Sequence, residues 1–209
     1  MTGTGTQAAE KPRRRQARGE RRIEQLLEAA AQVFQEVGYP AASTNGIARA
    51  AGVSPGTLYQ FFPNKEALAV ELGRRLMAEL EQTHGRVLSG ADTTRPLAEI
   101  LDTVLDPLIA FNLGHPAFFV LIHGPEAPGE IVSDHEELHA VLQQQITDLV
   151  ARRAPDLPIP ELDRVSVMAF AIFRAGLALV MHSDGAQREG YIVELKSALH
   201  RYLAPVLGS

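Results

Sequence analysis

The stretch Thr44–Lys65 reads TNGIARAAGVSPGTLYQFFPNK, and it decides the fold expected for this chain. It predicts two short helices, one beginning near Thr44 and one after Ser54, because Ser and Thr are favoured N-caps and Pro55 takes the first helical position. Gly52 lies between them, where a tight turn favours glycine. The residues that would lock the two helices together are small or apolar: Ile47, Ala48, Ala51, Val53, Leu58 and Phe62. This pattern predicts a helix-turn-helix.

The segments on both sides of this stretch also read as helices. Before it, apolar residues recur at steps of three and four from Ile23 to Val37, and Gly38 and Pro40 predict the stop. After it, Asn64 is a further N-cap. Helices are expected over residues 66–89, 96–113, 116–123, 130–153, 161–182 and 187–207. Nothing shows sustained period-two alternation, so the predicted fold is all-α.

Three regions are expected along the chain. Residues 1–19 are polar and basic and are predicted to form a disordered arm. Residues 20–65 form the three-helix unit that contains the helix-turn-helix. Residues 66–209 form a larger helical domain.

Composition narrows the class of protein. The 209 residues include no cysteine, which excludes disulfides and thiolate metal sites. No uninterrupted apolar run reaches about 18 residues, and the N-terminus has no apolar signal region, so a cytoplasmic protein without a membrane partner is expected. The net charge of −5 is unevenly divided. Through Lys65 there are nine Lys and Arg against five Glu, and this asymmetry suggests that the first part faces a polyanion.

The second helix of the motif presents an uncharged, hydrogen-bonding face. On a helical wheel Leu58, Phe61 and Phe62 point inward, and the opposite face suits the major groove of double-stranded DNA. Gln60 can pair with adenine, and Thr57 and Tyr59 can meet a thymine methyl group or phosphates. The predicted DNA-binding residues are Thr44, Ser54, Pro55, Gly56, Thr57, Tyr59, Gln60 and Lys65. The alternative is a three-helix packing unit with no nucleic-acid partner.

Residues 20–70 resemble the DNA-binding domain of the TetR family of bacterial regulators. The motifs that carry the resemblance are Leu27–Tyr39, Thr44–Ala48, Ala51–Ser54, Gly56–Tyr59, Phe61–Phe62 and Asn64–Leu68. Leu27 replaces the usual Ile, and Gln60 stands where the family often has His or Tyr, so no base preference carries over. The resemblance implies a homodimeric repressor whose larger helical domain binds a small molecule and then releases a palindromic operator.

The last two helices are the expected dimer interface. The segment 161–182 is apolar on almost every side, so more than one neighbour must cover it. Ala175, Gly176 and Ala178 are small and permit close helix approach. The alternative places both helices inside a monomer core.

Aromatic and polar side chains in the middle of the chain form a candidate effector site. They are Phe111, His115, Phe118, Phe119, His123, His139, Met168 and Phe173. Aromatic walls with a few polar groups suit an apolar or aromatic ligand, whereas each aromatic residue taken alone is better explained by core packing. No cofactor and no catalytic residue are expected.

One motif favours a different function, a metal site. His135-Glu136-Glu137-Leu138-His139 matches H-E-x-x-H, which on a helix can bind zinc and supply a general base. Glu161 is the only downstream candidate for a third ligand. A zinc metalloenzyme is therefore the competing hypothesis, beside a regulatory metal site, a polar contact to a ligand, and a plain polar helix face.

Overall fold

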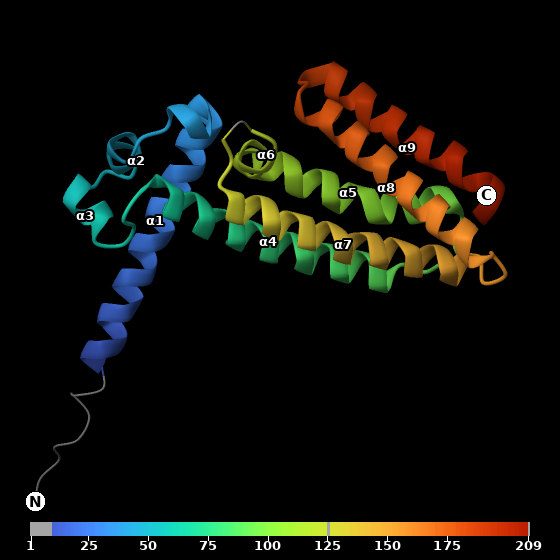
Figure 1. Cartoon of the computed structure of the whole chain (residues 1–209), viewed down its shortest axis with the longest axis horizontal. Coiled ribbons are helices and arrows are strands. Elements are labelled where there is room, and N and C mark those ends of the chain that lie inside the picture. The colour runs from blue at the N-terminus through green and yellow to red at the C-terminus, as the bar shows by residue number, and fades with distance from the viewer. Residues whose placement is uncertain (1–9, 125, 209) are drawn as a thin grey trace, which may run out of the picture.

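The computed structural model describes residues 10–124 and 126–208. Over these ranges the chain forms nine helices and no strand, so the predicted all-α fold is confirmed (Figure 1). The helices are α1 (Glu10–Ala41), α2 (Thr44–Ala50), α3 (Pro55–Tyr59), α4 (Lys65–Gly90), α5 (Leu97–Gly114), α6 (Pro116–His123), α7 (Gly129–Arg153), α8 (Ile159–Met181) and α9 (Gly185–Leu207).

The start of α1 differs from the sequence expectation. Residues 1–9 lie outside the described residues, but the chain is helical from Glu10 onward, so the disordered arm is wrong for residues 10–19. Gln16, Ala17 and Arg18 have high intrinsic helix propensity, and extending an existing helix costs far less than nucleating one. The stop predicted at Gly38 coincides with a break inside α1, where Gly38 has a φ of 76°.

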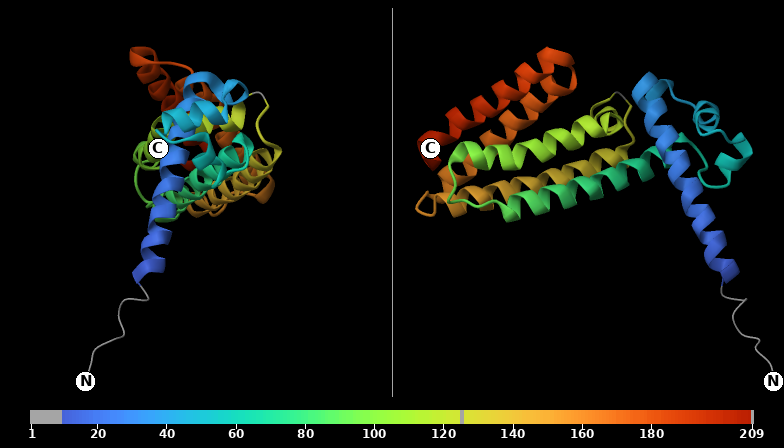
Figure 2. Two further views of the ribbon diagram at one scale, coloured as in Figure 1. Left: turned by 90° about the vertical axis from the view of Figure 1, so that its left-hand side faces the viewer. Right: turned by 180° about the vertical axis from the view of Figure 1, so that it is seen from behind.

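The first three helices form a small unit at one end of the molecule (Figures 1 and 2). Leu26, Ala30 and Phe34 of α1 are fully buried and belong to the same core as Ile47 of α2 and Leu58 of α3. Helix α4 leaves this unit and runs into the remaining helices, so one rigid element joins the two parts.

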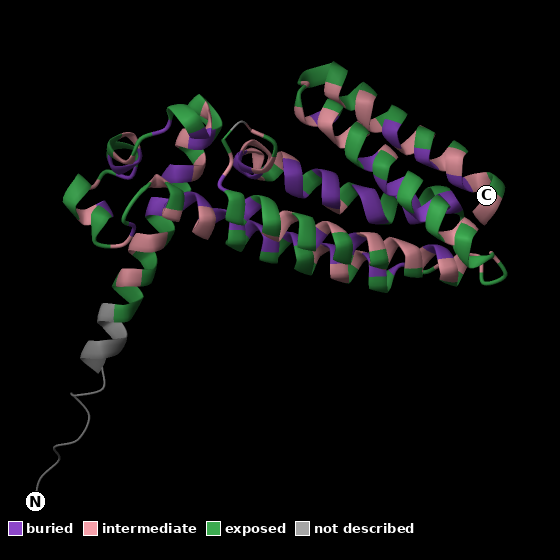
Figure 3. Cartoon of the chain, in the orientation of Figure 1, coloured by how far each residue is buried: buried purple, intermediate pink, exposed green. Residues whose placement is uncertain are grey.

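The larger part is a helical bundle. Helices α4 and α7 lie side by side beneath α5, and α8 and α9 form an antiparallel hairpin whose main contact is with each other (Figures 1 and 2). Buried residues follow the inward faces of α4 and α5, whereas α8 and α9 keep many exposed positions (Figure 3). Helix α6 packs on α1 and gives the bundle a second connection to the first unit.

Helix α8 corrects one expectation from the sequence. Its length and composition are sufficient to cross a membrane, although no uninterrupted apolar run had suggested this. The mean hydropathy of the segment stays high because Arg174 is the single charged residue that interrupts it. Core helices of soluble proteins meet the same criterion, and α8 packs on α7 and α9. Only 28% of its apolar window is buried, so α8 keeps an apolar surface.

Candidate nucleic-acid interface and internal cavity

Two local hydrogen bonds and one glycine turn set the helices of the first unit. The Ser43 side chain accepts from the backbone N–H of Gly46 at 3.1 Å and begins α2. Ser54 accepts from Thr57 N–H at 3.1 Å and begins α3, with Pro55 at the first helical position. The turn between the helices contains Gly52 at a φ of 64°, a conformation that side chains disfavour.

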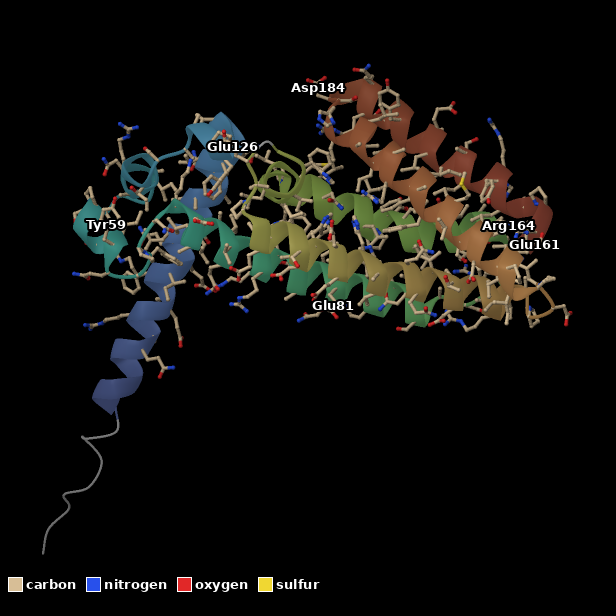
Figure 4. The ribbon with its side chains drawn as sticks, in the orientation of Figure 1. Tyr59, Glu81, Glu126, Glu161, Arg164 and Asp184 are labelled. Carbon is tan, nitrogen blue, oxygen red and sulfur yellow. The ribbon has the colours of Figure 1, made fainter. Side chains whose placement is uncertain are left out.

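Helix α3 presents its polar side to solvent. Leu58 and Phe62 are buried beneath it, while Pro55, Gly56, Tyr59 and Gln60 are exposed and Thr57 is partly exposed. Tyr59 is 52% exposed at the end of α3 (Figure 4). The expected outward face therefore exists as a surface.

Two hydroxyl pairs order this surface. Thr44 Oγ1 and Tyr59 Oη lie 2.9 Å apart, which ties the start of α2 to the end of α3. Ser54 Oγ and Thr57 Oγ1 also lie 2.9 Å apart. Of the residues expected to contact DNA, Ser54 thus acts first as a helix cap, and Thr44 acts first by holding the Tyr59 ring. The Gln60 backbone N–H donates to the Thr57 carbonyl at 3.3 Å, whereas its side chain forms no hydrogen bond with the residues that the structure describes.

Lys65 has a structural role that the sequence did not predict. Its Nζ donates to the carbonyl oxygens of Tyr39 and Pro40, both at 2.9 Å, and lies 4.6 Å from the centre of the Tyr39 ring. These contacts join the start of α4 to the end of α1. An ammonium has three N–H donors, so one remains for a phosphate. Lys65 is therefore a positioning residue first.

Sequence reasoning missed Arg49 on the same surface. It is exposed in the last turn of α2 and forms no ion pair with the described residues. The signal was present, because Arg49 is the one charged residue between Ser43 and Asn64.

A cavity of about 490 Å³ opens among α4, α5, α6, α7 and α8. The structure brings five of the eight predicted effector residues to its wall: Phe118, Phe119, His123, His139 and Phe173.

The other three do not line it. Phe111 is buried behind Phe118, with ring centroids 5.8 Å apart. His115 faces a separate surface hollow, where its Nε2 is 3.5 Å from Glu79 Oε1. Met168 is 49% exposed on the outer side of α8, because a helix with apolar residues all round must direct some of them away from the bundle.

Five polar residues of the cavity wall were not predicted to line it: His84, Asn112, His135, His182 and Arg174. His135 was considered only within the H-E-x-x-H motif, as a metal ligand, a polar contact to a ligand or part of a polar helix face. Arg174 carried the clearest signal, because it is the one charged residue between Val165 and Met181. A lone charge on an apolar helix usually faces a polar partner or a cavity.

Burial keeps the cavity imidazoles neutral. Desolvation lowers the pKa of His84 to about 4, against a weaker opposing effect of its hydrogen bond to the Leu80 carbonyl. Desolvation, followed by the charges of neighbouring histidines and Arg174, lowers the pKa of His135 to about 3. Desolvation and Arg174 lower the pKa of His139 to about 4, and the pKa of His123 is also below its usual value for these reasons.

The H-E-x-x-H motif forms only part of a metal site. The rings of His135 and His139 are 3.9 Å apart between centroids, but Glu136 between them is exposed. Glu161 lies at the far end of α8 (Figure 4). Within residues 10–124 and 126–208, no group of three or more His, Asp or Glu side chains is arranged to hold a metal ion. The zinc metalloenzyme hypothesis is not supported.

Comparison with known proteins agrees with this geometry. The model for bacterial regulatory proteins of the tetR family matches residues 26–72, and the model for the tetracyclin repressor-like C-terminal domain matches residues 96–203. The transcriptional regulator YhgD of Bacillus subtilis is 27% identical over 161 residues, which are 74% of this chain and 80% of the relative. The regulator UidR of Escherichia coli is 46% identical over 134 residues, 63% of each chain.

A crystal structure of a TetR-family transcriptional regulator from Streptomyces coelicolor shares the fold. Its TM-score is 0.56 at 29% identity, and the match covers 89% of this chain and 99% of that one. The second family model alone spans more than half of the sequence. The chain therefore belongs to the TetR family of DNA-binding transcriptional regulators.

Proposed function

We propose that the chain is a homodimeric repressor that leaves a palindromic operator when a small molecule fills the cavity. It acts in the cytoplasm without a catalytic residue or a cofactor. The observation that carries the proposal is the exposed face of α3. Gln60 and Tyr59 lie on this face, Leu58 on the opposite face is buried, and Ser54 caps the helix.

In this proposal α3 reads bases and its neighbours fix its register. Gln60 has a free amide that matches the hydrogen-bonding edge of adenine, and Gly56 lets the backbone approach the DNA closely. Tyr59, held by Thr44, and Arg49 contact phosphates. Lys65 holds α4 against α1 and so sets the angle at which the unit meets the groove.

The dimer forms through α8 and α9. Their exposed large apolar residues are Ile159, Val167, Met168 and Leu179 on α8 and Val193 on α9, all at least 49% exposed. Such residues on neighbouring helices make a surface that a second copy covers, as expected for a helical dimer with twofold symmetry. Two units spaced by this interface would read two successive major grooves.

Effector binding reaches the DNA-binding unit through α4 and α6. Helix α4 carries Lys65 at one end and the cavity residues Leu80 and His84 further along. Helix α6 lines the cavity and packs on α1. A ligand that prefers the dimer with wrongly spaced recognition helices shifts the population and lowers operator affinity.

The first test is binding to DNA from the region upstream of its own gene, followed by fluorescence anisotropy at several salt concentrations. Binding should weaken steeply as salt rises, because phosphate contacts release counterions. Gln60→Ala should weaken operator binding about tenfold with little effect on non-specific DNA. Gln82→Ala, an exposed glutamine on α4, is the matched control and should bind as the parent does.

Sedimentation of the same variants distinguishes recognition from folding. Gln60→Ala should sediment as the parent dimer does. A parent protein that remains monomeric at micromolar concentration, or one indifferent to its upstream DNA at low salt, would contradict the proposal.

A further inference from the structure

The cavity wall has an unusual balance of charge. It includes five histidines, one asparagine and Arg174, but no aspartate or glutamate. His84, His135 and His139 are neutral at pH 7, because their pKa values are lowered. The guanidinium of Arg174, in contrast, carries a full positive charge. Among the described residues no carboxylate pairs with it, and its nearest aromatic partner is the Phe170 ring at 5.9 Å. Arg174 is exposed to solvent where it borders the cavity, so the opening has a cation without a carboxylate partner among the described residues.

The imidazoles divide into two groups. His84 and His182 donate Nδ1–H to carbonyls of their own helices, at 3.1 Å to Leu80 and 2.7 Å to Ala178. His123, His135 and His139 form no hydrogen bond with any part of the chain that is described. Each neutral imidazole has one N–H donor, so three donors stand at the cavity beside Arg174 without a protein acceptor.

The three unpartnered rings are held close together by aromatic packing. His135 lies 5.7 Å from His123 and 3.9 Å from His139, measured between ring centroids. Phe119 packs on His123 at 4.5 Å, and Phe170 packs edge-on against His139 at 5.3 Å. The wall is thus a compact group of donors set among aromatic rings.

A smaller cavity of about 80 Å³ adjoins this one deeper in the bundle. His84, Leu142, Phe170 and Phe173 line both spaces. Beyond them the walls of the smaller cavity are mostly Leu, Ile and Val side chains from α5, α7 and α9. The polar group at one side is therefore continuous with an apolar interior at the other.

We propose that the effector is an amphipathic carboxylate. Its anionic head binds Arg174 and the N–H groups of His123, His135 and His139, and its aliphatic or aromatic body lies against Phe170 and Phe173 toward the smaller cavity. A guanidinium fork matches a carboxylate in a bidentate way, and its single positive charge balances a single negative one. This inference rests on the proposed function, because it names the ligand of the same regulatory cavity.

The same geometry disfavours a metal ion. Arg174 affects the pKa of His123, His135 and His139 through its charge, so it lies close enough to repel a cation bound between them. The wall also offers no carboxylate to offset the charge of a divalent ion.

The test is calorimetric titration of the full-length protein with matched probes. Octanoate and 4-phenylbutyrate are compared with octan-1-ol, 4-phenylbutyramide and the corresponding amines. At least one carboxylate should bind about ten times more tightly than its neutral analogue, because a hydrogen bond to a charged group contributes about one to two powers of ten in affinity and the exposure of Arg174 places the expectation at the lower end. The amines should not bind measurably.

Two variants test whether Arg174 and His135 cause the preference for a carboxylate over its neutral analogue. Arg174→Gln should remove the tenfold difference between acid and amide, and His135→Phe should reduce it while preserving the volume of the ring. Arg164→Gln is the control, because Arg164 is exposed on the same helix but lies at the end remote from the turn at Asp184 (Figure 4). It should bind the carboxylate as the parent does, and thermal melts should show all three variants folded.

Equal affinity for acid and amide, failure of both carboxylates to bind, or stoichiometric Zn²⁺ binding that both His135 and His139 require would each overturn the inference. Operator binding without any probe is measured in parallel. A protein that binds DNA but neither carboxylate loses only this inference, whereas one that binds carboxylates but no DNA loses the proposed function.

Discussion

The unit formed by α1, α2 and α3 and the bundle that follows it are specified by different kinds of interaction. In the first unit and at its junction with α4, side chains cap helices three residues ahead: Ser43, Ser54 and Asn64. In the bundle, α5, α6, α7, α8 and α9 all begin without a side-chain cap hydrogen bond. Contacts distant in sequence replace them, such as Arg152 donating to the Leu88 carbonyl at 2.8 Å.

This contrast suggests a division of labour. The recognition surface takes its helix starts and its turn from local sequence, and a few longer contacts such as Lys65 with the Tyr39 carbonyl add to them. A bundle held by packing can change its cavity without losing its fold, since cores tolerate apolar substitution of similar volume. Variants that act on one part and not on the other test this division.

The largest effect is expected from Phe34→Ala. The Phe34 side chain is fully buried in the core of the first unit, so removing it should lower the free energy of unfolding by about 3–5 kcal/mol. Val37→Ala on the same helix is the control, because Val37 is half-exposed and should cost less than about 0.5 kcal/mol. Urea denaturation measures both. If Phe34→Ala kept full operator affinity and stability, the first unit would not depend on this core.

The second-largest expected effect is a loss of stability at acidic pH, caused by histidines that are buried in the bundle. His84 has a pKa of about 4 in the folded protein and about 6.5 when unfolded, so the unfolded chain binds more protons between these values. Stability is therefore complete above pH 6.5 and falls as pH drops toward 4, by about 3 kcal/mol from this residue.

Urea midpoints at pH 7.5, 6 and 5 measure this slope. His84→Leu should make the slope shallower, and the remainder should come from His135 and His139, whose pKa values are lowered in the same direction. Gln82→Ala, which changes an exposed residue of the same helix and removes no titratable group, should retain the parental slope. An unchanged slope in His84→Leu would contradict the assignment.

The first unit could be read almost completely from the sequence because its determinants are local. Ser54, Pro55 and Gly52 each fix a backbone feature within three residues, and all were identified. The structural contacts of Lys65 could not be read from the sequence, because its acceptors, the carbonyls of Tyr39 and Pro40, lie more than 20 residues away. Arg49 lies on α2, outside the helix that was predicted to read bases.

For the bundle, the sequence predicted the helices but not the full set of residues that line the cavity. Helix bounds agreed to within a few residues, since proline and glycine mark them. Which side of α8 faces inward was not readable, because residues of similar apolarity surround it, and so Met168 was expected at a cavity that it does not reach. His84 and Arg174 meet there only through packing between α4 and α8.

A third effect concerns the hairpin of α8 and α9. A methyl group on Gly176 would lie 2.5 Å from Leu195 Cδ1 and 3.0 Å from Cγ, so Gly176→Ala should destabilise the bundle by about 1–3 kcal/mol. Gly190→Ala on α9 meets nothing within 4 Å and should be neutral or stabilising, because alanine favours helix. Thermal melts compare the two. Adding Leu195→Ala to Gly176→Ala should show favourable coupling, and strict additivity would refute the close contact.

The smallest effect separates local structure from recognition at one residue. Ser54→Ala removes the cap of α3 and should cost about 1 kcal/mol of stability. Ser54→Asp keeps a capping oxygen and adds a negative charge that the helix N-terminus stabilises, so its stability should equal or exceed that of the parent. The same charge faces the phosphates, and operator binding should fall more in Ser54→Asp than in Ser54→Ala. If the two variants lost affinity in proportion to stability, the start of α3 would serve folding alone, and the division between recognition and packing would fail at its most exposed point.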